Sequence, residues 1–436
     1  MHRRPRVLPG SFLRGKWGVL KVTSFHFMPY RDLPDDAEKR YPSMWIDAPW
    51  WELGDAEKVG DFYNQSIDEL MLAAKLGFDG LGTNEHHQNA YGFMCNPNLF
   101  GAILARLTRD LGYDDVAIVQ LGATIAATPP IRIAEEYAIL DCISGGRLVA
   151  GLPLGLGADA DISYSVIPIE QRERWREAID FLIKAWTAKE FFAWNGKHYQ
   201  FRKVNLWPRP IQDPHPPLII PGAASSSTWD YCHERDIPYA YLSYFGGKSS
   251  EAVMERFWQR AEQNGRDRNP YRGAFLQLVG VAETDAQAEE QFAEHVEYFY
   301  HKLLHQPSQY LAPPGYSDYK SLLNVLKQGF LEFADLRDLK KLSAKEMIER
   351  EFVVVGSPST VRERLTEMAR KLNIGHLMTV LQFGSMPHEL AMQNIELFGR
   401  EVLPHLQTLW DDEGWEHQWW PKRLHSTPVR DVPAGV

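Results

Sequence analysis

The segment 116–155, "VAIVQLGATIAATPPIRIAEEYAILDCISGGRLVAGLPLG", identifies the class of fold. It opens with an almost continuous apolar run, 116–128, which is typical of a strand buried on both faces of a parallel sheet. A helical segment follows over 130–144 and stops at two glycines, and a further strand is predicted over 147–155. Strand, helix and strand in this order indicate an α/β protein with a parallel sheet.

The same alternation continues on both sides of this segment. The predicted strands are 17–27, 78–83, 116–128, 147–155, 216–222, 238–243, 274–283 and 376–384. The clearest helical patterns are 61–77, 96–110, 130–144, 169–188 and 358–373. Eight strands that alternate with helices predict a (β/α)8 TIM barrel, with a doubly wound open sheet as the alternative.

Two long segments depart from a minimal barrel. One, 28–60, follows the first strand, and the other, 284–350, follows the seventh. Loops after barrel strands gather at the C-terminal face, where TIM-barrel sites are built, so we predict that both insertions are lids. With no repeat and no linker in the sequence, we expect a single domain over 1–436 that ends in a C-terminal tail, 405–436.

Composition narrows the class of protein. The net charge of −10 and the pI of about 5.9 argue against a nucleic-acid or anionic-membrane binder. No run reaches the roughly 18 apolar residues that span a bilayer, and the N-terminus lacks the apolar core of a signal peptide. The three cysteines are widely spaced and are interpreted as reduced thiols. These features predict a cytoplasmic protein.

A cluster of titratable residues, Glu85, His86 and His87, directly follows the predicted second strand. It could hold a metal, tie down a loop, or act as an acid, base or hydrogen-bonding group toward a ligand. Adjacent histidines on an extended backbone point to opposite sides, and the other strand ends supply no matching carboxylates, so we expect no metal. Imidazole titrates near neutrality, which favours the catalytic interpretation.

A second cluster lies in "IIPGAASSSTWDYC", 219–232, which reads as a strand, a turn of small residues and a helix. Backbone N–H groups and hydroxyls at a helix N-terminus can hold an anion without a basic side chain. The alternative is an ordinary helix cap. Four successive hydroxyl residues exceed what one cap uses, so we favour a phosphate site. The glycine motifs of nucleotide hydrolases and dinucleotide-binding folds are missing from the sequence.

Several motifs together resemble the bacterial luciferase-like flavin monooxygenases. They are the Glu-His-His cluster followed by Asn96–Pro97, the segment 139–147 that leads into the fourth strand, the serine-rich turn, and "GSPSTVRERL" at 356–365. The resemblance extends over about residues 17–400. It implies a TIM barrel that takes reduced FMN (FMNH2) from a flavin reductase, reacts it with O2, and oxygenates a small, hydrophobic organic substrate. It also implies a homodimer or higher homo-oligomer.

By position, the resemblance assigns roles to individual residues. His86 resembles the imidazole beside the flavin that transfers protons, with His87 next to it, and Glu85 resembles the carboxylate near the isoalloxazine. Gly122–Ala123 falls where the family has a small pair under the ring, often with an unusual peptide bond. The residues that fall at the flavin phosphate are Gly222, Ala223, Ala224, Ser225 and Ser226.

One position departs from the family pattern. Some relatives place an arginine after the fourth strand to meet the phosphate, where this sequence has Leu154. Phosphate binding must then rest on the serine turn or on an arginine from elsewhere. The family also includes enzymes that use the deazaflavin F420 for hydride transfer. An F420- or FMN-dependent hydride-transferring oxidoreductase and a non-catalytic flavin-binding barrel therefore stay open as alternatives.

Overall fold

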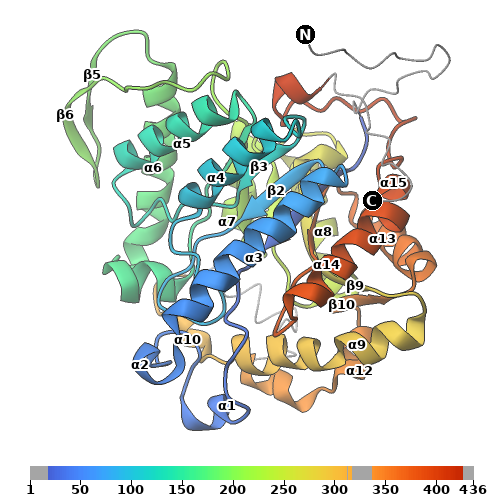
Figure 1. Cartoon of the computed structure of the whole chain (residues 1–436). Helices are drawn as coiled ribbons and strands as arrows, with labels where there is room; N and C mark the ends of the chain where they lie inside the picture. The colour runs from blue at the N-terminus through green and yellow to red at the C-terminus, as the bar shows by residue number, and fades with distance from the viewer. Residues whose placement is uncertain (1–17, 312, 317–335, 426–436) are drawn as a thin grey trace, which may run out of the picture.

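Eight parallel strands close into a barrel in the computed structural model, which describes residues 18–311, 313–316 and 336–425 (Figure 1). In order around the barrel they are β1 (Lys21–His26), β2 (Gly80–Thr83), β3 (Ala117–Gln120), β4 (Leu148–Gly151), β7 (Leu218–Gly222), β8 (Tyr239–Tyr241), β9 (Gly273–Val281) and β11 (His376–Val380). The pairings β11–β1 and β8–β9 complete the ring. The predicted TIM barrel is confirmed, and the open sheet is wrong.

Helices between the strands surround the barrel and bury their apolar faces on it. They are α3 (Ala56–Lys75), α4 (Pro97–Asp110), α5 (Pro130–Ser144), α6 (Pro168–Thr187), α7 (Ser226–Arg235), α8 (Gly246–Gln263), α9 (Asp285–Glu297), α13 (Pro358–Leu372) and α14 (His388–Leu397). Local signals explain several of their ends. The Asn96 side chain caps α4 by accepting a hydrogen bond from the Asn98 N–H, and Gly145 ends α5 in the left-handed region at φ 70°.

Several elements differ from the sequence prediction. The apolar run at 116–128 pairs as a strand only over 117–120, and the predicted strand at 376–384 ends at residue 380. The remainder of each run is buried loop, because apolarity reports burial rather than strand pairing. A ninth strand, β10 (Val353–Gly356), pairs with the carboxyl-terminal half of β9, between the predicted insertion 284–350 and the predicted helix 358–373, where no strand was predicted.

The sequence prediction also missed a small antiparallel hairpin between α6 and β7. Its strands are β5 (Phe192–Asn195) and β6 (Gln200–Val204), and it projects from the barrel beside α6 (Figure 1). Most of its residues are exposed or half-buried, so its sequence carries little of the apolar pattern that marks a buried strand.

The two insertions contact each other at the carboxyl ends of the barrel strands. The first contains α1 (Ala37–Arg40) and α2 (Trp50–Leu53); the second contains α9, η3 (Tyr298–Leu303), α10 (Ser308–Leu311), η4 (Leu336–Lys341) and α12 (Ala344–Glu349). The Trp45 indole N–H donates to the Leu303 carbonyl at 2.9 Å, and the Tyr310 hydroxyl donates to Asp47 at 3.0 Å. Residues 312 and 317–335 of the second insertion lie outside the described residues.

The chain from α14 onward leads to the opposite end of the barrel. It continues through η5 (Phe398–Val402) and α15 (Leu403–Leu406) to η6 (Lys422–Leu424). His417 and Trp420 pack there against His376, the first residue of β11. The predicted C-terminal tail is thus packed on the amino-terminal mouth of the barrel over its described part, which ends at residue 425.

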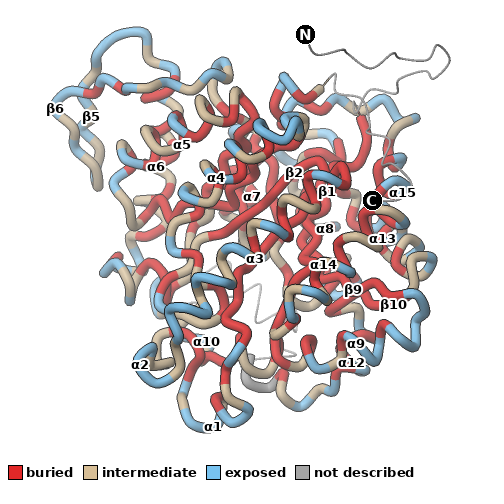
Figure 2. The backbone as a smooth tube through the Cα atoms, viewed as in Figure 1, coloured by how far each residue is buried: buried red, intermediate tan, exposed pale blue. Residues whose placement is uncertain are grey.

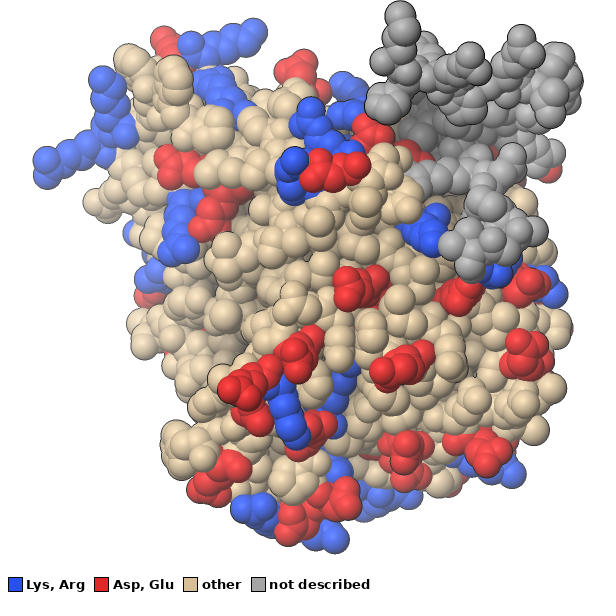
Figure 3. Space-filling model, viewed as in Figure 1, with Lys and Arg blue, Asp and Glu red and all other residues tan. Residues whose placement is uncertain are grey.

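Burial follows this architecture. Figure 2 shows the barrel strands buried along their length and the surrounding helices exposed on their outer sides. On the face seen in Figure 3, acidic and basic side chains are interspersed. Among the described residues, none of the helices combines the length and the apolar composition needed to cross a bilayer.

Candidate active site

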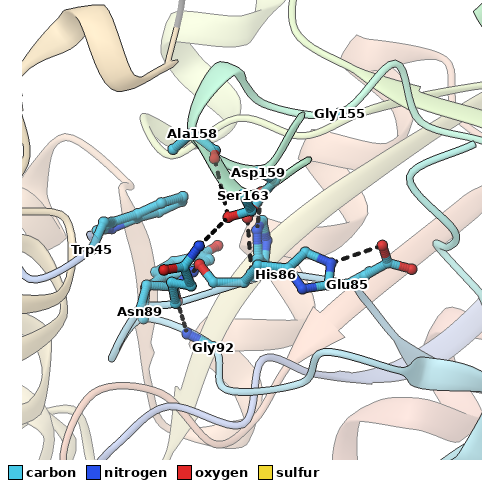
Figure 4. Close-up of polar contacts among 12 residues, drawn as sticks. Trp45, Glu85, His86, Asn89, Gly92, Gly155, Ala158, Asp159 and Ser163 are labelled. Atoms are coloured by element: carbon cyan, nitrogen blue, oxygen red, sulfur yellow. Dashed lines mark hydrogen bonds and ion pairs between the residues drawn. The ribbon is translucent and has the colours of Figure 1, made fainter. Parts of the chain in front are cut away.

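The predicted Glu-His-His cluster lies at the carboxyl end of β2, and a carboxylate that the sequence prediction missed joins it. His86 Nδ1 is 2.8 Å from Oδ2 of Asp159, and the backbone N–H of His87 donates to Oδ1 of the same residue at 2.8 Å (Figure 4). Asp159 belongs to a short π-helical turn, η1 (Ala158–Ile162), in the loop after β4. The Asp159 side chain, which is 2% exposed, therefore joins the loop after β2 to the loop after β4.

The two histidines contact different groups. Nε2 of His87 is 2.9 Å from Glu85 Oε1, and the His87 ring packs edge-on against Tyr164. Glu85 therefore pairs with His87, whereas His86 pairs with Asp159, as expected for neighbours on an extended chain. Within the described part of the chain, no group of three or more His, Cys, Asp or Glu side chains has the geometry to hold a metal ion.

Two aromatic rings, from the first insertion and from the loop after β2, pack around His86. Trp45, from the first insertion, and Tyr91 lie edge-on to the imidazole at 5.5 Å and 5.0 Å between ring centroids, and they stack on each other. The hydroxyl of Tyr91 is 3.0 Å from that of Tyr244. Burial raises the pKa of Tyr244 to about 12 and that of Tyr91 well above its usual range, so both phenols stay protonated at neutral pH.

The predicted small pair, Gly122 and Ala123, lies in the buried loop after β3. Gly122 has φ 151°, and a Cβ there would fall 2.1 Å from the Gly151 carbonyl oxygen, so glycine is required. The Ala123 N–H donates to the Tyr137 hydroxyl, which donates to the Gly151 carbonyl. The cis peptide bonds among the described residues precede Pro208 and Pro214; the bond between residues 122 and 123 is trans.

The serine turn connects β7 to α7 as predicted. Gly222 ends the strand, Ala223 is exposed, Ala224 has φ 20°, and α7 begins at Ser226. The Ser225 hydroxyl makes no capping hydrogen bond and lies 3.3 Å from the Ser227 hydroxyl. The serines at this helix N-terminus are half-buried, and the helix-cap interpretation lacks its hydrogen bond.

Two arginines that the sequence prediction missed approach this turn from α6. Arg172 donates to the Thr228 hydroxyl at 3.0 Å, and Arg176 donates to the Ser227 carbonyl at 3.2 Å. They lie one helical turn apart on α6. Because that spacing is also typical of a solvated helix face, the sequence did not mark these arginines as phosphate ligands. Leu154, at the position where some relatives have an arginine, is buried in the apolar core.

A sequence model of the family described as luciferase-like monooxygenase matches residues 54–373. The chain belongs to this family. Among its relatives, the flavin-dependent trigonelline monooxygenase, oxygenase component, of Acinetobacter baylyi is 27% identical over 48% of this chain and 57% of its own length. The alkanal monooxygenase alpha chain of Photobacterium leiognathi is 23% identical over 77% of this chain and 91% of its own length.

Solved structures share the barrel fold of this chain. The oxygenating constituent of 3,6-diketocamphane monooxygenase of Pseudomonas putida, solved with FMN, superposes with a TM-score of 0.62 at 18% identity, over 88% of this chain and 98% of its own. An F420-dependent secondary alcohol dehydrogenase superposes with a TM-score of 0.60 at 15% identity, over 89% and 99% of the two chains. The resemblance and the enzyme class predicted from the sequence, a monooxygenase of the luciferase-like family, are confirmed.

Proposed function

We propose that this luciferase-like protein uses reduced FMN and O2 to oxygenate a small, hydrophobic organic substrate. The observation that carries the proposal is the presence of two polar clusters at the carboxyl ends of the barrel strands: the imidazole of His86 after β2, and the serine turn with its two arginines after β7. The first suits proton transfer, and the second suits a dianionic phosphate. FMN requires both a phosphate site and a reaction centre.

The phosphate site follows from the chemistry of its donors. The N-terminus of α7 carries a partial positive charge, and the hydroxyls of Ser225, Ser226 and Ser227 supply further hydrogen bonds. The guanidinium groups of Arg172 and Arg176 supply the positive charge that the Leu154 position lacks. This donor set fits a phosphate better than it fits a neutral ligand.

Bound reduced flavin supplies the electrons that activate O2 for transfer to the substrate. The protein holds a proton-transferring imidazole at His86 and keeps water away with Trp45 and Tyr91. Between η1 and the start of α6, beside His87, four large apolar side chains are each at least 42% exposed. Their exposure favours a hydrophobic substrate. The four residues are Ile162, Tyr164, Ile167 and Ile169.

The partners follow from the same proposal. A relative is named as an oxygenase component, which supports a separate flavin reductase as the source of FMNH2. Exposed Leu99 and Ile103 on α4 and Ile139 on the adjacent α5 support a homodimer or higher homo-oligomer formed through these helices. A mass measurement in solution tests this assembly, and a monomer at micromolar concentration would contradict it.

The runner-up is hydride transfer with F420, supported by the F420-dependent structural neighbour. Two experiments separate oxygenation with FMN from hydride transfer with F420. The purified chain is first titrated with reduced FMN, riboflavin and F420 under anaerobic conditions. O2 is then added in the presence of candidate substrates. The proposal requires tight binding of reduced FMN and oxygen-18 incorporation from O2 into a product. Preferential binding of F420, with substrate reduction or oxidation that needs no O2, would replace it. Flavin binding without product would favour a flavin-binding barrel.

Replacing Arg172 and Arg176 together by glutamine is expected to weaken FMN binding by about 1–3 kcal/mol, the scale of hydrogen bonds to a charged group. The same loss is expected when Ser225 and Ser226 are both replaced by alanine. The dissociation constant measured by flavin fluorescence should rise about 5- to 150-fold. Binding of riboflavin, which has no phosphate, should barely change.

Arg174→Gln on the same helix is the matched control, because Arg174 pairs with Glu170 and makes no contact with the serine turn in the described structure. Equal losses for FMN and riboflavin would show that the turn serves the structure of α7 and binds no phosphate.

A further inference from the structure

Each oxygen of the Asp159 carboxylate has a partner within the described structure. Oδ1 accepts the backbone N–H of His87, and Oδ2 faces Nδ1 of His86, each at 2.8 Å. The residue is almost completely buried, so an ionised carboxylate there depends on these two donors. Oδ2 therefore needs a proton on the nitrogen that faces it.

We propose that Asp159 is a positioning residue that keeps the ring proton of His86 on Nδ1 and thereby presents the Nε2 lone pair to the reacting group. The proposal rests on the proposed catalytic role of His86. An unprotonated Nδ1 would place two acceptors 2.8 Å apart in a buried site, which is unfavourable. With the proton on Nδ1, the lone pair of Nε2 is free to accept a proton.

The surroundings of the ring preserve this orientation. Trp45 and Tyr91 pack edge-on against the imidazole and restrict its rotation, so that a flip that exchanges the two nitrogens would require repacking of buried rings. Nε2 has no hydrogen-bond partner among the described residues, which leaves it available to a ligand. One nitrogen of His86 is thus committed to the protein and the other is open.

The position of Asp159 does not depend on His86 alone. Gln88 donates to the Ser163 hydroxyl at 3.0 Å, and that hydroxyl donates to the Ala158 carbonyl, which ties η1 to the segment after β2 (Figure 4). The His87 N–H provides a further bond to the carboxylate. These contacts make Asp159→Asn a mild change in shape, because an amide oxygen can keep the bond to His87 while the charge is removed.

The first test is nitrogen-15 NMR of the ring of His86 in the full chain without flavin, assigned by comparison with His86→Ala. The expected spectrum at neutral pH shows the proton on Nδ1. In Asp159→Asn the amide group can donate to Nδ1, so the tautomer with the proton on Nε2 should gain population. A wild-type ring with its proton on Nε2 would overturn the proposal, whatever the enzyme catalyses.

The second test is turnover with reduced FMN, O2 and an organic substrate found by screening. Asp159→Asn should lose roughly 10- to 100-fold in kcat, a part of the contribution of an acid or base, while KM and FMN affinity change little. Asp161→Asn removes a neighbouring charge in η1 and is expected to keep wild-type turnover. Wild-type kcat in Asp159→Asn would overturn the positioning role. If His86→Ala keeps full activity, the catalytic role of His86 is contradicted. The effect of Asp159 on the tautomer is tested independently, because NMR measures it without turnover.

Discussion

Turnover of the His86→Ala variant is expected to fall about 10²- to 10⁴-fold, the range that a positioned acid or base contributes. The side chain is 12% exposed, and its Nε2 is the ring nitrogen left open by the contact with Asp159. Alanine removes the imidazole and leaves Asp159 bound to the His87 N–H, so the barrel should remain folded.

The measurement is oxygen-18 incorporation from O2 into product at saturating reduced FMN, together with the hydrogen peroxide released per flavin oxidised. His405→Ala, at an exposed position on α15, is the matched control and should behave as wild type. Full turnover in His86→Ala with reduced FMN would reduce the cluster to a polar network that orders the loop after β2.

Acidification from pH 7 to pH 5 is expected to lower the free energy of unfolding by about 2 kcal/mol through His376, and further through His417, at the amino-terminal mouth of the barrel. Burial lowers the pKa of His376 from 6.5 to about 3 and that of His417 well below 6.5. Their rings lie 5.0 Å apart, and His417 packs on Tyr271. Below pH 6.5 the unfolded chain binds protons at these residues whereas the folded chain does not. The free energy of unfolding therefore decreases by roughly 1.4 kcal/mol per histidine for each unit by which the pH is lowered.

Urea unfolding midpoints between pH 7 and pH 5 measure this effect. His417→Phe, which keeps a ring but cannot be protonated, should reduce the pH dependence, and His405→Phe should leave it unchanged. An identical slope in His417→Phe would contradict the assignment. Glu69 acts at lower pH: burial alone would raise its pKa, but hydrogen bonds from His26 and His388 lower it to about 2, so its contribution is lost only below about pH 4.5.

The fold could be predicted from sequence because each barrel strand has a local apolar pattern. The α5 boundaries at 130–144 match the prediction, since a proline at the start and Gly145 at the end act within one turn. β10 was missed because its three valines stand next to a helical segment and are too few to show a period.

The site was predictable only in part, for a physical reason. The Glu-His-His cluster and the serine turn are contiguous in sequence, and strand ends of a barrel gather on one face. Asp159 lies 73 residues from His86, and Arg172 lies 56 residues from Thr228. Contacts between residues so far apart in sequence depend on which loops the fold brings together, and no local sequence pattern predicts them. An isolated aspartate or a helical arginine is common on any protein surface.

The closure of the barrel bears on how this chain is made. β1 pairs with β11 over residues 21–24, and the Thr379 hydroxyl donates to the Thr23 carbonyl across 356 residues of sequence. During synthesis, the free edge of β1 and the apolar interior stay uncovered until almost the whole chain has left the ribosome. Folding is therefore limited by the last strand to arrive, and the nascent chain depends on protection from aggregation for most of its translation.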